Sequence, residues 1–277
     1  MELLRLGPGL NAVRDQAALL LAKPGQRALV LADLHIGWES TLASRGFHVP
    51  SQVGKMLKQI KSIVRAYGPQ KLIFLGDVKH TVAGAEAEEW AEIPAFFEEL
   101  KKFVDEIAVV PGNHDGRLEA LLPDGVEMLN SGGIALWGFF GLFHGHAWPS
   151  PELLACKWLI TGHVHPVVVF REGPYFRTSS RVWLLMDCDG PSLAEEMVRR
   201  GKARAGELSD VKAGKLIVMP SFNEFLGGQA INRPRASDES LIGPVLRSRS
   251  VDLAGAEVYM LDGTFLGTVG QLRQSGI

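Results

Sequence analysis

Short signatures of histidine, aspartate and asparagine recur along the first 165 residues of the chain. Seven of the eight histidines lie in or beside these signatures, and only His48 stands apart. Imidazole and carboxylate together suit manganese, iron, zinc or cobalt better than calcium, which takes oxygen ligands. The spacing indicates a centre with two metal ions. In chain order the signatures are Asp33-Leu34-His35, Gly76-Asp77-Val78-Lys79-His80, Gly112-Asn113-His114-Asp115, His144-Gly145-His146 and Gly162-His163-Val164-His165.

A pair of metal ions roughly 3.5–4 Å apart can activate a water and neutralise charge on phosphoryl oxygens, as phosphate ester hydrolysis requires. Asp33 and His35 are separated by one residue, so an extended chain would point both in the same direction. His163 and His165 repeat this spacing. Gly76 has no side chain, which would let the backbone approach the metals closely. These features indicate hydrolytic chemistry.

The third signature adds two other functional groups. Asn113 offers a neutral oxygen ligand, and His114 beside it is a suitable proton donor to a leaving oxygen. The pair therefore predicts a metal ligand next to a general acid.

Five apolar runs of strand length each end at one of the signatures. Unbroken apolar runs are typical of strands buried on both faces. Ligand sites in α/β sheets lie at the carboxyl ends of such strands, so we expect the signatures to meet there. The runs are residues 28–32, 71–75, 107–110, 139–143 and 157–161.

The segments between these runs predict helices over residues 51–67, 86–102 and 117–122. Pro94 lies inside the second segment, which favours a kink or a helix that starts near Ile93. Further strands are expected at 164–170, 181–186, 258–261 and 264–269, and a helical segment at 192–208 is broken by Gly201.

This order of elements predicts a four-layer α/β/β/α sandwich of two mixed β-sheets flanked by helices. We expect one domain over residues 1–277 with its metal-ligand core at about 28–166. Residues 187–277 would complete the second sheet and overhang the site.

Composition sets modest limits on partners and location. With 277 residues, 46% of them hydrophobic, the chain can bury a large core. Its 29 basic and 31 acidic residues give a net charge of −2, which offers no global attraction to nucleic acids or membranes. The N-terminus has no signal-peptide pattern, and Cys156 and Cys188 are too few for a disulfide framework. We expect a cytoplasmic protein with no membrane contact, and the oligomeric state stays open.

The ordered set D-x-H, G-D, G-N-H-D, H-G-H and G-H-x-H resembles the calcineurin-like metallophosphoesterase superfamily, and all five blocks occur between Leu29 and His165. Three segments also resemble the prokaryotic SbcD-related, ICC-like branch of predicted phosphohydrolases. They are LADLHIGW (31–38), GDVKH (76–80) and PSFNEFLG (220–227).

The resemblance implies two divalent transition-metal ions, with manganese expected first and iron, zinc, cobalt or nickel as alternatives. A hydroxide that bridges the ions would attack phosphorus in line, and His114 would protonate the leaving group. The first histidine of the fourth block is the usual ligand in this family, so His144 is preferred to His146. The implied ligands are Asp33, His35 and His165 for the first metal, Asn113, His144 and His163 for the second, and Asp77 as the bridge.

Other polar residues near the signatures have several possible roles. His80 and His146 could orient metal ligands, contact substrate or be merely polar neighbours of the site. Asp115 could hold His114 in position or cap the 117–122 helix. Arg233 and Arg235 lie in a polar loop that could reach the site.

Two groups of basic residues are explained more simply by solvated surfaces than by a phosphate track. They are Lys55, Lys58, Lys61 and Arg65 in one group, and Arg199, Arg200, Lys202 and Arg204 in the other.

The expected function is therefore a dimetal phosphoesterase that cleaves a phosphodiester. The alternatives are a phosphomonoesterase or nucleotide pyrophosphohydrolase, or a nuclease-like accessory subunit or binding module of a DNA-processing complex. The substrate could be a nucleotide, a small phosphodiester or a nucleic acid. The chain has neither a G-x-x-x-x-G-K-[ST] phosphate loop nor a G-x-S-x-G nucleophile elbow.

Overall fold

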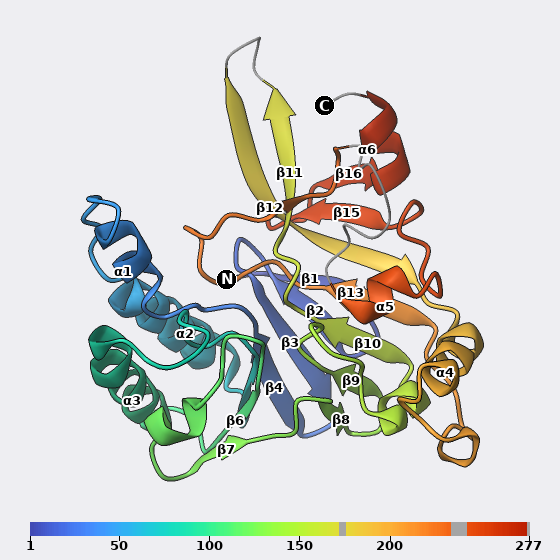
Figure 1. Cartoon of the computed structure of the whole chain (residues 1–277), viewed down its shortest axis with the longest axis horizontal. Coiled ribbons are helices and arrows are strands. Elements are labelled where there is room, and N and C mark those ends of the chain that lie inside the picture. The colour runs from blue at the N-terminus through green and yellow to red at the C-terminus, as the bar shows by residue number, and fades with distance from the viewer. Residues whose placement is uncertain (172–175, 234–242, 276–277) are drawn as a thin grey trace.

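The computed structural model describes residues 1–171, 176–233 and 243–275. Two mixed β-sheets pack face to face, and helices cover both outer faces (Figure 1). The α/β sandwich predicted from the sequence is confirmed. Within the described residues, no helix combines the length and the apolar character needed to cross a lipid bilayer.

The first sheet has seven strands in the order β1-β2-β3-β4-β5-β6-β7. Neighbours from β1 to β4 are antiparallel, and those from β4 to β7 are parallel. Strands β1, β2 and β3 had not been predicted from the sequence. The bounds are β1 Leu3–Gly7, β2 Leu10–Val13, β3 Ala18–Lys23, β4 Gln26–Leu31, β5 Lys71–Leu75, β6 Glu106–Val110 and β7 Val126–Met128.

The second sheet follows the order β14-β11-β12-β13-β10-β9-β8, and β15 pairs with both β12 and β16. Strands β11 and β12 extend beyond the rest of this sheet (Figure 1). The bounds are β8 Ile134–Leu136, β9 Phe140–Leu142, β10 Trp158–Thr161, β11 Pro166–Arg171, β12 Arg177–Asp187, β13 Lys215–Val218, β14 Gln229–Ala230, β15 Glu257–Met260 and β16 Phe265–Thr268.

Two of the predicted helices differ from expectation. Helix α3 runs without a break through Pro94 and does not start near Ile93, because a capping box of Glu86 and Glu89 begins the helix earlier. The segment expected over 117–122 is a short 3-10 helix. The helices are α1 Trp38–Ala43, α2 Val53–Tyr67, α3 Ala87–Lys101, α4 Gly190–Arg199, α5 Pro244–Arg247 and α6 Val269–Ser275, with 3-10 helices η1 Leu118–Leu121, η2 Pro151–Ala155 and η3 Ala205–Glu207.

Alternate residues of the central strands face different apolar layers. In β4, Leu29 and Leu31 pack with the buried faces of α2 and α3, whereas Ala28 and Val30 pack between the two sheets. The other face of the second sheet is covered by α4, α5 and α6, which contribute Leu193 and other apolar residues. Side chains alternate across a strand, so unbroken apolar runs are what a strand buried on both faces requires.

The chain direction brings the five signatures to one edge of the sandwich. Strands β4, β5 and β6 are parallel to one another, and β9 is parallel to β10. The five strands end at Leu31, Leu75, Val110, Leu142 and Thr161, each one or two residues before a signature. The loops at this edge therefore carry all of the predicted metal ligands.

Candidate metal centre

Histidine and aspartate side chains from both sheets converge into groups that could each hold a metal ion. One group contains Asp33, His35, Asp77 and His165, with ligand atoms within 4.8 Å of one another. Another contains Asp77, His144 and His163 within the same limit. Asp77 belongs to both groups, so the arrangement offers two adjacent metal positions that share one carboxylate.

A cavity of about 590 Å³ opens onto these residues. His35, Asp77, His163 and His165 line it, and so does the remaining predicted ligand, Asn113, whose residue is exposed. His114 lines the same cavity. The structure thus brings the predicted acid and five of the seven predicted ligands to the wall of one cavity, with Asp33 and His144 buried behind it.

Five predicted ligands adopt the left-handed backbone conformation, which is uncommon outside glycine. The φ angles are 59° for Asp33, 45° for His35, 50° for Asp77, 68° for His163 and 46° for His165. The sequence suggested that alternate ligands converge because the chain is extended, and this reason is wrong. They converge because tight turns after β4 and β10 direct them inwards, and such backbone strain is typical of functional sites.

Two signature glycines leave the space that these ligands occupy. A Cβ atom on Gly76, which has a φ of +74°, would lie 2.4 Å from Nδ1 of His144. A Cβ atom on Gly112 would lie 2.2 Å from Oδ1 of Asp77. Neither contact is possible for real atoms, so any larger residue would displace a predicted metal ligand.

The His144 ring is oriented by a backbone carbonyl. Its Nδ1 donates a hydrogen bond of 2.7 Å to the Leu75 carbonyl oxygen. This bond leaves Nε2 directed at Oδ2 of Asp77, at 3.4 Å, and at Nδ1 of His163, at 3.2 Å. Carbonyl contacts of this kind fix the tautomer of histidines that bind metal through the other nitrogen.

Charge distribution in the site favours a bound cation. Burial alone would lower the pKa of His144, but the carboxylates of Asp77 and Asp33 raise it to about 9. Burial would likewise raise the pKa of Asp33, yet His165 and His144 hold that pKa below its usual value. Both carboxylates are therefore ionised, and their negative charge favours a cation beside them.

Two other histidines of these groups, His35 and His163, supply neutral nitrogen donors, whereas the carboxylate of Asp33 raises the pKa of His165 despite its burial. Burial lowers the pKa of His35 to about 3 and the pKa of His163 to about 4. The Nε2 atoms of His35 and His165 are buried and make no hydrogen bond among the described residues, although Nε2 of His165 lies 3.2 Å from Oδ1 of Asp33. Buried nitrogens without hydrogen bonds are costly, and a divalent ion would provide the missing partner.

The two carboxylates also hold the surrounding loops together. Asp33 accepts hydrogen bonds from the backbone N–H of His163 at 3.0 and 3.2 Å, which connects the loop after β4 to the loop after β10. Asp77 accepts a hydrogen bond of 2.9 Å from the backbone N–H of His114. The ligands thus fix the relative positions of the loops that bear them.

His114 and His80 form a contact beside the first group. Nδ1 of His114 donates a short hydrogen bond to the carbonyl oxygen of His80, and the two rings stack with centroids 5.6 Å apart. The ring of His80 reaches His35, with 3.2 Å between the two Nδ1 atoms. His80 therefore contacts a predicted ligand, and the carbonyl leaves Nε2 of His114 for another partner.

His146 and Asp115 lie near the ligands without joining either group. The ring centroid of His146 is 5.2 Å from that of His144. The Asp115 carboxylate accepts hydrogen bonds from the backbone N–H groups of Val78, Lys79 and Gly112, at 2.9, 3.2 and 2.8 Å. It neither holds the His114 ring nor caps η1, the two roles considered from the sequence, because its oxygens are occupied by the loops after β5 and β6.

Arg233 does not line the cavity at the metal ligands, and Arg235 lies outside the described residues. The polar loop reaches the site through other residues. Asn223 donates a hydrogen bond of 3.0 Å from its side chain to the Leu34 carbonyl oxygen, and Gly227, Gly228 and Gln229 line the cavity. The adjacent glycines in this loop were the available signal for such a close approach.

Comparisons with known proteins agree with this geometry. Residues 26–167 match the calcineurin-like phosphoesterase family. No curated protein matches the chain. Among solved structures, a nuclease MPE from Pseudomonas putida is similar, with a TM-score of 0.54 and 21% identity over 94% of this chain and 96% of its own. The phosphoesterase YfcE from E. coli has a TM-score of 0.32 and 22% identity over 53% of this chain and 74% of its own.

Proposed function

This chain belongs to the calcineurin-like phosphoesterase family and is an enzyme that hydrolyses phosphate esters, and we propose that it is a phosphodiesterase with a dimetal centre. Members of the family use divalent metal ions. The observation that carries the proposal is that two groups of buried ligand atoms share the carboxylate of Asp77. A shared carboxylate is what two adjacent cations need in order to stay close together.

The residues present fit such a pair of ions, and we expect manganese first. The ions would supply an activated water and neutralise charge on the phosphoryl oxygens when bound. Asp33, His35 and His165 would hold one ion and Asn113, His144 and His163 the other, with Asp77 common to both.

His114 is proposed as the proton donor to the leaving oxygen. The His80 carbonyl can only accept, so Nδ1 of His114 carries a proton. In the protonated ring Nε2 carries the second proton, and this proton is the one that the leaving oxygen would receive.

Two finer assignments follow from the sequence. The segments LADLHIGW, GDVKH and PSFNEFLG support the SbcD-related, ICC-like branch of the family. We also propose that residues 1–277 act as one metallophosphoesterase domain, because β13 and β15 from the last third pair with β12 of the second sheet.

Metal analysis and two chromogenic substrates test the proposal. Purified protein saturated with Mn²⁺ is expected to hold two ions and to hydrolyse bis-(p-nitrophenyl) phosphate faster than p-nitrophenyl phosphate. Asp77→Asn should lose both the activity and at least one ion. The matched control is His48→Ala, which removes an exposed histidine that belongs to none of the signatures. Folded protein that binds no Mn²⁺, or that prefers the monoester, would contradict the proposal.

A further inference from the structure

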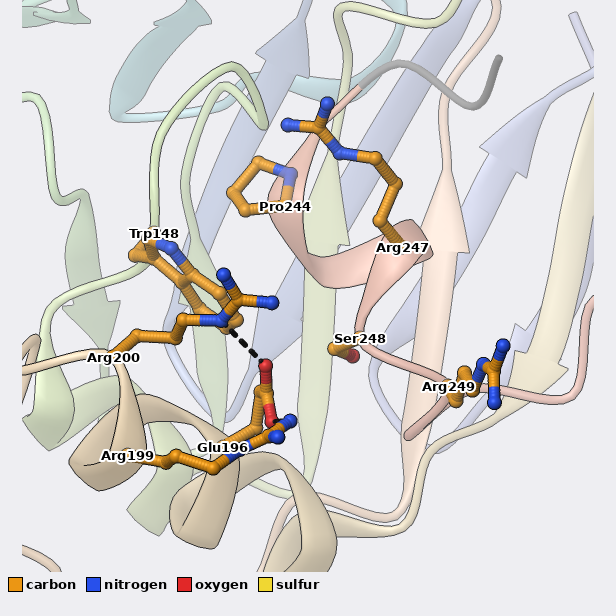
Figure 2. A pocket seen from close by; sticks show the side chains of 8 residues that line it. All are labelled: Trp148, Glu196, Arg199, Arg200, Pro244, Arg247, Ser248 and Arg249. Carbon is orange, nitrogen blue, oxygen red and sulfur yellow. Dashed lines mark hydrogen bonds and ion pairs between the residues drawn. The ribbon is translucent and has the colours of Figure 1, made fainter. Parts of the chain in front are cut away.

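A second cavity, of about 660 Å³, is formed by helices α4 and α5, the segment that follows α5, and Trp148 (Figure 2). Four arginines line it: Arg199 and Arg200 at the end of α4, and Arg247 and Arg249 at and after the end of α5. We call these four residues with Trp148 the arginine pocket. The basic residues at the end of α4 are exposed, as expected from the sequence, and two of them line the same cavity as two arginines from a distant part of the sequence.

The arginine pocket has an excess of positive charge. Among the residues that the structure describes, Glu196 is the one acidic residue of the lining; its side chain is only 8% exposed and is already paired with Arg199 and Arg200. The hydrogen bond from Nε of Arg200 to Glu196 is 2.8 Å long. Arg247 and Arg249 are exposed and form no ion pair with any described residue. The described lining residues thus carry a net charge of +3, and two of the four arginines have no carboxylate partner among them.

The segment that presents the two unpaired arginines is fixed in place. Arg249 has a φ of 61°, a conformation unfavourable for a non-glycine residue. The neighbouring Ser250 accepts a backbone hydrogen bond of 2.7 Å from Asp189, and its own N–H donates to Oγ of Ser248 at 3.2 Å. The surrounding contacts therefore impose the position from which Arg249 extends.

A segment beside the arginine pocket packs against a loop of the metal centre. Gly243, directly before α5, packs so closely on the fourth signature that a Cβ atom there would lie 2.5 Å from the Gly145 carbonyl oxygen and 4.0 Å from the His163 ring. Trp148 follows His146 by two residues. The pocket is thus next to the side of the centre formed by His144 and His163.

We propose that the substrate is a nucleic-acid strand, and that the arginine pocket binds a backbone phosphate of this strand beyond the diester at the metal centre. Guanidinium groups bind phosphate oxygens in a bidentate manner. Trp148, which is half-buried at the edge of the pocket (Figure 2), offers an aromatic surface on which a base can stack. The chain carries a net charge of −2, so this local positive charge, not a global one, would attract the strand. The inference rests on the proposed phosphodiesterase function.

The test removes the two unpaired arginines and leaves the ion pairs of Glu196 intact. The variant Arg247→Ala/Arg249→Ala is compared with Lys202→Ala/Arg204→Ala, which removes two exposed cations that follow α4 but do not line the pocket. Circular dichroism and thermal unfolding verify that both variants are folded. Fluorescence anisotropy then measures binding of a labelled 20-nucleotide single strand to each protein in EDTA, over a range of salt concentrations.

The pocket variant should raise the Kd of the strand about tenfold, as expected for the loss of two charge-assisted phosphate contacts. The slope of log K against log salt should become less steep by about 0.7, since each phosphate of a single strand that the protein neutralises contributes about this amount. The control variant should change both quantities much less. An unchanged Kd in the pocket variant, or an equal loss in the control, would refute the inference.

Two further measurements separate the possible causes of failure. With Mn²⁺, the kcat/KM for bis-(p-nitrophenyl) phosphate should be the same in the wild type and the pocket variant, because this small diester reaches only the metal centre. Absence of that hydrolysis in the wild type would refute the proposed function by itself. Competition by a mononucleotide or inorganic phosphate as strong as that by the strand would identify a free phosphate ligand and overturn the assignment of a strand.

Discussion

Replacement of Asp115 tests how the loops of the metal centre are held together. This buried carboxylate accepts hydrogen bonds from three backbone N–H groups. Two belong to Val78 and Lys79, which follow Asp77, and one belongs to Gly112, directly before Asn113. In Asp115→Ala, all three donors lose their acceptor inside a buried loop. We expect a loss of both stability and activity, because the two loops carry the shared metal ligand and the predicted acid.

The magnitude follows from the number of bonds. A hydrogen bond to an ionised acceptor contributes about 1.5–3 kcal/mol, and one to a neutral acceptor about 1 kcal/mol. We use the smaller value because burial raises the pKa of Asp115 to about 6, so removal of the carboxylate also relieves its desolvation. Three bonds then give a destabilisation of about 3 kcal/mol, which corresponds to a decrease in Tm of roughly 6–12 °C.

Asp115→Asn should have an intermediate effect. Its remaining oxygen can still accept from Val78 and Lys79, but the amide group would face the N–H of Gly112, donor against donor. The expected loss is about 1–2 kcal/mol, from one broken bond and one unsatisfied donor. Urea unfolding of the proteins in EDTA, followed by circular dichroism, measures these differences.

The control for both variants is Asp124→Ala, which removes an exposed carboxylate and should change stability by less than about 0.5 kcal/mol. The reasoning is refuted if Asp115→Ala unfolds at the same urea concentration as this control. It is also refuted if Asp115→Asn is as destabilised as Asp115→Ala, since the preserved bonds would then contribute nothing.

Three other predictions concern the ligands themselves. Without metal, the pKa of His144 is raised to about 9, so a cation that binds below that pH must displace the proton of this histidine. The affinity for metal should therefore fall up to tenfold per unit of decreasing pH. Calorimetry in buffers of different ionisation enthalpy should show the proton release. Gly76→Ala should abolish metal binding because its Cβ would lie 2.4 Å from His144, whereas Gly25→Ala, with a similar φ of +76° and no neighbour within 4 Å, should bind metal normally. Normal metal content in Gly76→Ala would contradict the role of the close contact with His144. His114→Ala should lower turnover of bis-(p-nitrophenyl) phosphate at least 100-fold with both ions retained, and full turnover in this variant would exclude His114 as the acid.

The sequence by itself determined the fold class and the set of polar groups at the metal centre. Strands β4, β5, β6, β9 and β10 are continuous apolar runs, and hydrophobic burial on both faces permits few other arrangements for them. Each run ends at a polar signature, so parallel pairing alone was enough to predict that the signatures meet. Local pattern carries this information because strand burial and chain direction are properties of short segments.

Only the tertiary structure decided how those groups are presented and what lies around them. The left-handed turns at Asp33 and His165 are imposed by contacts between loops. The sequence therefore predicted correctly that the ligands converge, but the extended chain that it gave as the cause was wrong. The role of Asp115 depends on the backbone of Val78, which is 37 residues away in the sequence. The arginine pocket joins Arg200 to Arg249 across two separate helices. Contacts between segments far apart in the chain leave no periodic trace in the sequence, because each partner alone has the pattern of an ordinary polar surface.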